Sequence, residues 1–282
     1  MYHLTWMRPL SLTTPMNNYS PTTIFFSKVT SFCIYIFQTM YQRCLQPIRP
    51  TNSKKQLQVP TNLVVENNNK LQVTVHDILS LANYTYLNDV IINYILDNHH
   101  KETDRPDIYL LDSLFFTSLT HHPSLASNWT KNTNIFTYNK IIIPICQCQH
   151  WTLIVISPSD KTIQLYNSLL PRNLPSGEHN ILLCRIQKFL YSEYHRIYQD
   201  TLPFPFHQSI VQGLPQQTSS ADCGLFTLHF ASSIMKNKEI QWDNYPHTIE
   251  LRQKYAQFCI KNLPQQLQDQ IWSCLALPRP TS

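Results

Sequence analysis

Three apolar segments follow one another through the middle of this chain, and they constrain its fold more than any other feature. They cover residues 140–146, 152–156 and 162–166 and carry mainly isoleucine, leucine and valine between polar turns. Short segments of this kind predict β-strands. The polar turn at residues 158–161 predicts a hairpin between the last two. Pro144 predicts a bulge or a sheet edge in the first strand, because proline cannot donate a ladder hydrogen bond.

Predicted helices precede and follow this sheet. The helix that begins near residue 90 has Asn88 or Asp89 as its predicted N-cap. The expected helices cover residues 76–81, 90–96, 114–119, 180–195, 225–235 and 249–261, and two further short strands are expected at 107–111 and 208–212. An order of helices, sheet and helices predicts the α+β class.

The chain has 282 residues, enough for one large or two small domains. Residues 1–60 lack hydrophobic periodicity, so we expect a poorly ordered or unassigned N-terminal extension there. A domain is expected over 61–275 and a tail over 276–282. The fairly apolar stretch 24–40 is interrupted by Lys28 and falls short of the roughly 20 apolar residues of a membrane span, which argues against a membrane partner.

Charge and cysteine content indicate the protein's setting. The net charge is +5 and charged residues make up 14% of the chain. The densest basic cluster, Arg49 with Lys54 and Lys55, is too sparse for a nucleic-acid footprint, so no nucleic-acid partner is expected. The eight cysteines show no short disulfide framework, and most lie in apolar runs, as reduced core cysteines do. We expect a monomer in a reducing intracellular compartment, the nucleus or the cytoplasm.

Cys223 stands where the predicted helix over 225–235 begins. The positive end of a helix favours a thiolate, which is the nucleophilic form of cysteine. Its neighbours Ser219, Ser220, Ala221 and Gly224 are small and would let a substrate backbone approach. The simpler alternative is a buried core cysteine, the commoner fate of this residue type.

His150 and Asn167 offer a base and an orienting group for such a thiol. Asn167 follows His150 by 17 residues, across the predicted hairpin. Adjacent antiparallel strands bring such residues side by side. The amide oxygen would accept from one imidazole nitrogen and leave the other to face Cys223. Alternatively, His150 is an ordinary core or surface residue, and Asn167 an ordinary turn residue.

Gln217 lies six residues before Cys223. A side-chain amide there would join the Cys223 backbone N–H in stabilising an oxyanion. The neighbouring Gln216 would serve equally well on sequence grounds. Either glutamine is alternatively a plain polar loop residue.

A zinc site is a competing interpretation of the same region. Cys146, Cys148 and His150 alternate along a segment expected to be extended, so all three would face one side. A structural zinc needs four ligands, and no fourth is spaced accordingly. We therefore expect no metal and no cofactor.

Taken together, these residues resemble the ubiquitin-like-protein-specific cysteine proteases, the SUMO or sentrin-specific protease family. Four blocks carry the resemblance in the family's order, and it covers roughly residues 70–265. The blocks are Tyr86–Asn93, Ile143–Leu153, Tyr166–Leu169 and Pro215–Gly224. The resemblance implies a papain-like fold, with a central, mostly antiparallel sheet flanked by helices, and makes 61–275 a catalytic domain.

The resemblance also implies roles and partners. Cys223 would be the nucleophile, His150 the base and Gln217 the oxyanion donor. Trp151 would line a narrow aromatic channel that accepts only a Gly-Gly tail, and Asp89 would contact the modifier. The implied partners are a ubiquitin-like modifier and its conjugates, and the implied reaction is thiol attack followed by thioester hydrolysis.

Two positions depart from the family's pattern. Asn167 replaces the triad aspartate, and an amide cannot stabilise an imidazolium by charge. Tyr86 replaces a channel tryptophan with a smaller ring. Three interpretations therefore stay open: an active protease with reduced activity, a non-catalytic modifier-binding module, and a protease of a virus or mobile element that processes a polyprotein.

Overall fold

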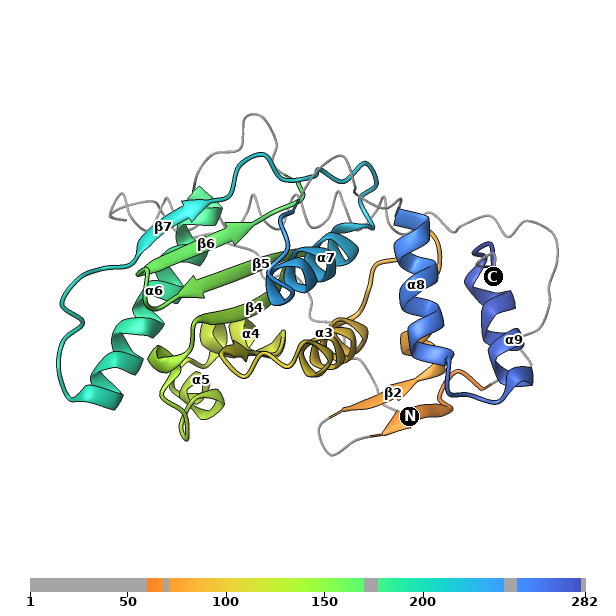
Figure 1. The fold of residues 1–282 in the computed structure, drawn as a ribbon, viewed down its shortest axis with the longest axis horizontal. Helices are drawn as coiled ribbons and strands as arrows, with labels where there is room; N and C mark the ends of the chain where they lie inside the picture. The colour runs from red at the N-terminus through yellow and green to blue at the C-terminus, as the bar shows by residue number, and fades with distance from the viewer. Residues whose placement is uncertain (1–59, 68–70, 170–176, 241–247, 280–282) are drawn as a thin grey trace, which may run out of the picture. The chain divides into compact units, whose positions relative to one another are not determined.

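A five-stranded sheet of order β3-β4-β5-β6-β7 forms the framework of the fold (Figure 1). The computed structural model describes residues 60–67, 71–169, 177–240 and 248–279. The central strands are antiparallel, whereas β3 is parallel to β4 and β7 is parallel to β6. The strands are β3 (Ile108–Leu110), β4 (Lys140–Gln147), β5 (His150–Ser157), β6 (Thr162–Tyr166) and β7 (His207–Ile210). The predicted central antiparallel strands are confirmed.

The β4–β5 hairpin ends in a two-residue turn directly before His150. Its register is unbroken up to the Gln147–His150 pair, so only Cys148 and Gln149 form the turn. Their φ angles are +50° and +60°, the left-handed pattern of a type I′ turn. The segment Cys146–His150 is therefore not extended throughout, and the prediction that Cys146, Cys148 and His150 all face one side is wrong. Pro144 is not at a bulge, but lies beyond Ile142, where the pairing with β3 ends.

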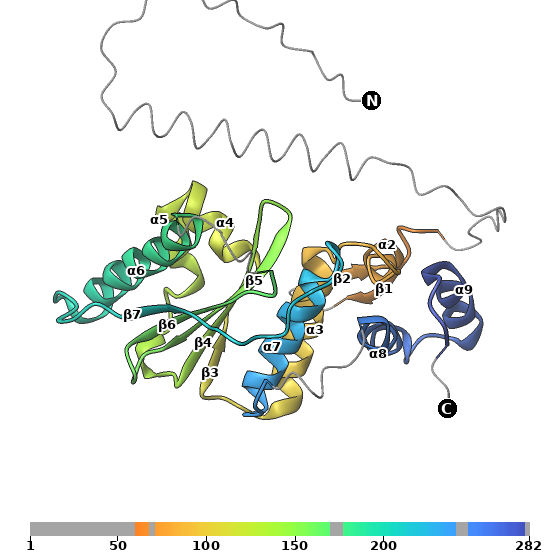
Figure 2. The same ribbon diagram turned by 90° about the horizontal axis from the view of Figure 1, so that it is seen from above.

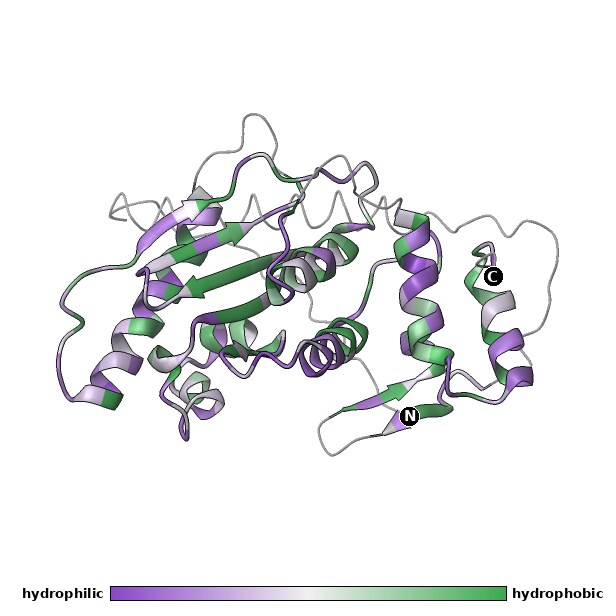
Figure 3. Cartoon of the chain, in the orientation of Figure 1, coloured by the Kyte–Doolittle hydropathy of each residue, from purple (hydrophilic) through white to green (hydrophobic). Residues whose placement is uncertain are grey.

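Two groups of helices cover the two faces of the sheet (Figure 2). One face packs against α3 (Asp89–Thr103) and α7 (Cys223–Met235), and the other against α4 (Leu114–His121) and α6 (Gly177–Tyr198). Side chains alternate along β5, with Leu153 in the first core and Ile154 in the second. The middle of β5, Leu153–Ile156, is buried on both faces and is therefore a continuous apolar run, and most of the β5 arrow is green in Figure 3.

A second, smaller group of elements packs at the side of α3 and α7. Thr74 caps α2 through a capping box with Asp77, which explains why this short helix forms. The group consists of β1 (Val64–Asn67), β2 (Gln72–Thr74), α2 (Val75–Leu79), α8 (Thr248–Ile260) and α9 (Gln265–Leu275). Short turns complete the fold at α5 (Pro123–Ala126), η1 (Ser127–Trp129) and η2 (Ile135–Thr137). The sequence did not predict β1, β2, α5 or α9.

The other predicted helices are present, with longer bounds for α3 and α6. Asn88 is the N-cap of α3, since its side chain accepts from the Ile91 N–H. In the described part of the chain, no helix is long and apolar enough to cross a membrane. No disulfide joins the described cysteines, but the expected core placement is wrong for Cys146, Cys148 and Cys184, which are exposed. The stretches 24–40 and 49–55 lie outside the described residues.

Candidate active site

Cys223 is the first residue of α7, and its side chain is fully buried. Burial raises the pKa of its thiol, while N–H groups of Trp151, Gly224 and Cys223 itself act in the opposite direction. The sequence predicted a stabilised thiolate at this helix start. Desolvation outweighs these N–H groups, so the pKa of the thiol lies above its ordinary value and the predicted stabilisation of a thiolate is not found.

Gly224 lets three separate segments of the chain meet beside this sulfur. A Cβ built on Gly224 would lie 3.0 Å from Leu87 Cβ and 3.3 Å from Trp151 Cδ1. The indole N–H of Trp151 donates to the Leu87 carbonyl at 2.9 Å. The start of α7, the start of β5 and the segment before α3 are therefore packed together at a point where a Cβ would be crowded.

His150 is the first residue of β5, one position before Trp151. Its ring Nε2 lies 2.8 Å from Asn167 Oδ1, so the register prediction that paired these residues is correct. Asn167 follows the end of β6 and is 2% exposed. The His150 ring forms a hydrogen bond with Asn167. The contact between β5 and Cys223 is made by the next residue, Trp151, whose backbone N–H is directed at the Cys223 sulfur.

The backbone of Leu169 determines the tautomer of His150. Its N–H donates to Asn167 Oδ1 at 2.8 Å. A backbone N–H can only donate, so the amide atom that faces both Leu169 and His150 is the oxygen. His150 must then donate from Nε2, which leaves Nδ1 as the unprotonated nitrogen. Burial lowers the pKa of His150, so the ring is neutral at pH 7.

A second histidine, which the sequence analysis did not single out, completes this row of side chains. Nε2 of His179, in the first turn of α6, lies 3.1 Å from Asn167 Nδ2. Because that amide nitrogen donates, the His179 ring accepts the bond as a neutral imidazole. Asn167 is therefore held between two imidazole rings. The proximity of His179 to Asn167 depends on how α6 packs, and no spacing in the sequence predicts it.

The two glutamines that the sequence left equivalent differ in the structure. Gln217 is buried, and its Oε1 accepts from the Ser168 hydroxyl at 2.7 Å. Its Nε2 donates to the Ser219 carbonyl at 2.9 Å, close to the start of α7. Gln216 instead donates to the Leu214 carbonyl at 3.1 Å. The amide directed at the segment before Cys223 belongs to Gln217.

The remaining predicted binding residues lie at or close to the start of α3. Asp89, the first residue of α3, is exposed. Tyr86 is partly buried and packs against the core that contains Trp151. Trp151 itself is 3% exposed, so its ring belongs to the core that underlies the start of α3. The described residues contain no group of three or more histidine, cysteine or acidic side chains that could hold a metal ion.

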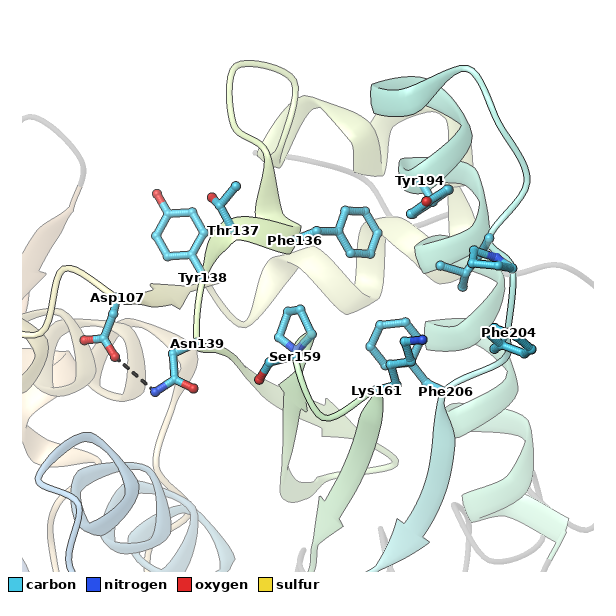
Figure 4. Close-up of a pocket in the computed structure, with 13 residues that line it drawn as sticks. Asp107, Phe136, Thr137, Tyr138, Asn139, Ser159, Lys161, Tyr194, Phe204 and Phe206 are labelled. Carbon is cyan, nitrogen blue, oxygen red and sulfur yellow. Dashed lines mark hydrogen bonds between the residues drawn. The ribbon is translucent and has the colours of Figure 1, made fainter.

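A pocket of about 540 Å³ opens at the other end of the sheet (Figure 4). It lies beside the β5–β6 turn, about 26 Å along the strand from His150 at the usual rise per residue. Phe136, Tyr138 and Phe204 are among the residues that line it. None of the predicted site residues contributes to this pocket, so it is separate from the Cys223 region.

The chain belongs to the Ulp1 protease family, because the sequence model of that family's C-terminal catalytic domain matches residues 85–267. The members of this family are cysteine proteases. Human sentrin-specific protease 2 is 27% identical over 194 residues, which cover 66% of this chain and 32% of that protein. A sentrin-specific protease of Caenorhabditis elegans is 25% identical over 57% of this chain and 23% of its own length. The chain thus spans about a third of the length of the first of these relatives.

Solved structures of the same family share the fold. The C-terminal Ulp1 protease domain in complex with Smt3, the yeast orthologue of SUMO, superposes with a TM-score of 0.62 at 26% identity. The match covers 73% of this chain and 90% of that one. A Ulp1 structure whose catalytic cysteine is oxidised to a sulfenic acid gives a TM-score of 0.61, and covers 71% of this chain and 89% of its own. The predicted α+β, papain-like fold is confirmed.

Proposed function

We propose that this chain is a cysteine protease that cleaves after the Gly-Gly C-terminus of SUMO or a related modifier, in precursors and in isopeptide conjugates. The observation that carries this proposal is the arrangement around His150. Its Nε2 donates to Asn167, which leaves Nδ1 free to accept, and the backbone N–H of the next residue, Trp151, is directed at the Cys223 sulfur. The family membership supports the substrate class, since one of its solved members is bound to a SUMO protein.

Before the reaction, the Cys223 thiol and the His150 imidazole are both neutral, because burial raises the pKa of the thiol and lowers the pKa of the imidazole. His150 Nδ1 would accept the thiol proton as the Cys223 sulfur attacks the carbonyl carbon of the modifier's last glycine. Hydrogen bonds of this kind tighten when substrate arrives. The Cys223 N–H and Gln217 Nε2 would stabilise the oxyanion. His150 would then protonate the leaving amine and activate the water that hydrolyses the thioester, so no cofactor is needed.

The segment before α3 would bind the modifier. Exposed Asp89 is placed to contact the modifier's surface, while Tyr86 would form the wall of the channel for the Gly-Gly tail. Trp151 supports that wall from the core side and fixes it through its hydrogen bond to Leu87. Since a tyrosine ring is smaller than the tryptophan of relatives, we expect a channel of different width and a different preference among modifiers.

Asn167 also favours a second candidate function, a modifier-binding module without turnover. An amide orients the histidine but adds no negative charge to stabilise the imidazolium formed during attack. This candidate predicts binding of micromolar affinity, typical of transient complexes, with no covalent product.

A probe with an electrophile in place of the last carbonyl of SUMO separates the two candidates. The protease labels covalently and the Cys223→Ala variant does not, while Cys146→Ala, Cys148→Ala and Cys184→Ala control for the exposed thiols. Turnover of a fluorogenic SUMO substrate should follow the labelling. Binding of the probe without any labelling by the wild type would contradict the protease and support the binding module.

A further inference from the structure

We propose that His179 is a positioning residue, which accepts the Asn167 side-chain N–H and thereby keeps the amide oxygen turned toward His150. This inference rests on the proposed function of His150 as the base. It assigns a role to a residue on α6 that belongs to none of the four sequence blocks.

The problem that His179 solves is specific to an amide. A carboxylate presents oxygen on both sides, so either orientation serves the histidine. The amide of Asn167 presents oxygen on one side and nitrogen on the other, and only one orientation lets it accept from His150. Rotation by 180° would turn Nδ2 toward His150 Nε2, which would then have to accept. The proton would move to Nδ1, and the base would be lost.

Two contacts oppose this rotation from opposite sides of the amide. The Leu169 N–H holds the oxygen at 2.8 Å, and the His179 ring accepts from the nitrogen at 3.1 Å. Asn167 is 2% exposed, so water does not readily replace a lost partner. Without His179, the buried amide nitrogen would have no acceptor in this orientation, and the rotated form would gain population.

The position of His179 suits this role. It lies in the first turn of α6 and is only partly buried, so a substitution there removes little core packing. The three side chains form one row, His150–Asn167–His179, that runs from β5 across the end of β6 to α6.

The expected effects follow from the chemistry of the acceptor. His179→Leu should lower kcat by about 10- to 100-fold, the usual cost of losing a partner behind an orienting group, with KM nearly unchanged. His179→Gln should restore most of kcat, because its amide oxygen can accept the same bond. Asn180→Ala, at the exposed next position of α6, serves as the matched control and should leave kcat unchanged.

The decisive comparison repeats His179→Leu in an Asn167→Asp background. Carboxylate oxygens need no acceptor behind them, so His179→Leu should cost less than threefold in kcat there. An equal loss of kcat in both backgrounds overturns the proposal and makes His179 merely structural. No loss in the Asn167 background overturns it as well.

A second readout is independent of activity. Nitrogen NMR of the wild type should report His150 with its proton on Nε2, and the His179→Leu variant should show a substantial fraction with the proton on Nδ1. An unchanged tautomer contradicts the role of His179. If the wild type shows the Nε2 tautomer, loses it in the variant and yet cleaves no modifier, the proposed protease function fails while the positioning role stands.

Discussion

Nε2 of His150 lies 2.8 Å from Oδ1 of Asn167, at the position where the resemblance to the family implies a triad aspartate. The same oxygen accepts the Leu169 N–H, so the amide is held as an acceptor. A carboxylate would orient the imidazole ring partly by its charge, whereas Asn167 orients it by hydrogen bonds alone. The imidazole ring is oriented but stays neutral, because burial lowers the pKa of His150 and no anion opposes that effect.

Asn167→Ala should therefore lower kcat/KM by about 10²- to 10⁴-fold, the range seen when the ring loses its correct tautomer. Asn167→Asp should keep the acceptor and raise the pKa of His150 by about one unit or more through its charge. The base works in its neutral form, so the acidic limb of the pH profile of kcat/KM should move to higher pH. Profiles of the wild type and both variants measure this, and identical acidic limbs would contradict the assigned base.

The sheet could be predicted from sequence because β4, β5 and β6 carry their own signals. The middle of β5, Leu153–Ile156, is buried on both faces and apolar, and the turn at Pro158–Lys161 fixes the register with β6. That register places His150 beside Asn167, so this pair could be expected from local information. The Cys148–Gln149 turn could not, since neither residue is a usual occupant of a left-handed turn position.

The missed features depend on tertiary packing. β1 and β2 are short and mostly polar, and α9 carries glutamines between the few apolar residues that it buries, such as Ile271 and Trp272. His179 reaches Asn167 because α6 crosses the end of β6, and no local pattern contains that crossing. The neutral state of Cys223 was likewise missed, because burial depends on the complete fold.

Gly224→Ala should destabilise the protein by about 1–3 kcal/mol, the usual cost of an extra methyl group in a packed core. The new Cβ would lie 3.0 Å from Leu87 Cβ and 3.3 Å from Trp151 Cδ1, both of which belong to buried side chains. Chemical denaturation measures the loss, and the fluorescence of Trp151 should change as well. Gly213→Asn is the control, because Gly213 has open space around it and asparagine tolerates its φ of +74°.

Arg252→Met should cost about 3–5 kcal/mol, because it leaves a buried charge without its partner. Arg252 donates to Asp222 Oδ1 at 2.8 Å, directly before Cys223, and the two side chains are 1% and 6% exposed. Arg279→Met is the matched control, since Arg279 and Asp269 are paired at the same 2.8 Å but are 60% and 45% exposed. That variant should lose at most about 1 kcal/mol. Equal losses in urea denaturation would contradict a special role of the buried pair.

His99 should make the stability of the fold sensitive to mild acid. It is buried beside the rings of Tyr255 and Phe258, and burial lowers its pKa to about 4. This value includes smaller contributions from Lys236 and Lys254, which lower the pKa, and from Glu102, which raises it. The unfolded chain takes up this proton near the ordinary pKa of 6.5, whereas the folded chain does so only near 4.

Between these two values the unfolded state binds more protons, so the free energy of unfolding falls as the pH is lowered from 6.5 to 4. The contribution of His99 to this loss is about 3 kcal/mol, at 1.36 kcal/mol per unit of pKa shift. His99→Phe keeps an aromatic ring against Tyr255 but removes the titration, so its stability should fall less steeply over that range. Urea denaturation of both proteins at pH 7, 5.5 and 4.5 measures the two slopes. Parallel slopes would show that His99 is not the group responsible, whereas a difference that grows as the pH falls would identify this buried ring as the source of the acid sensitivity.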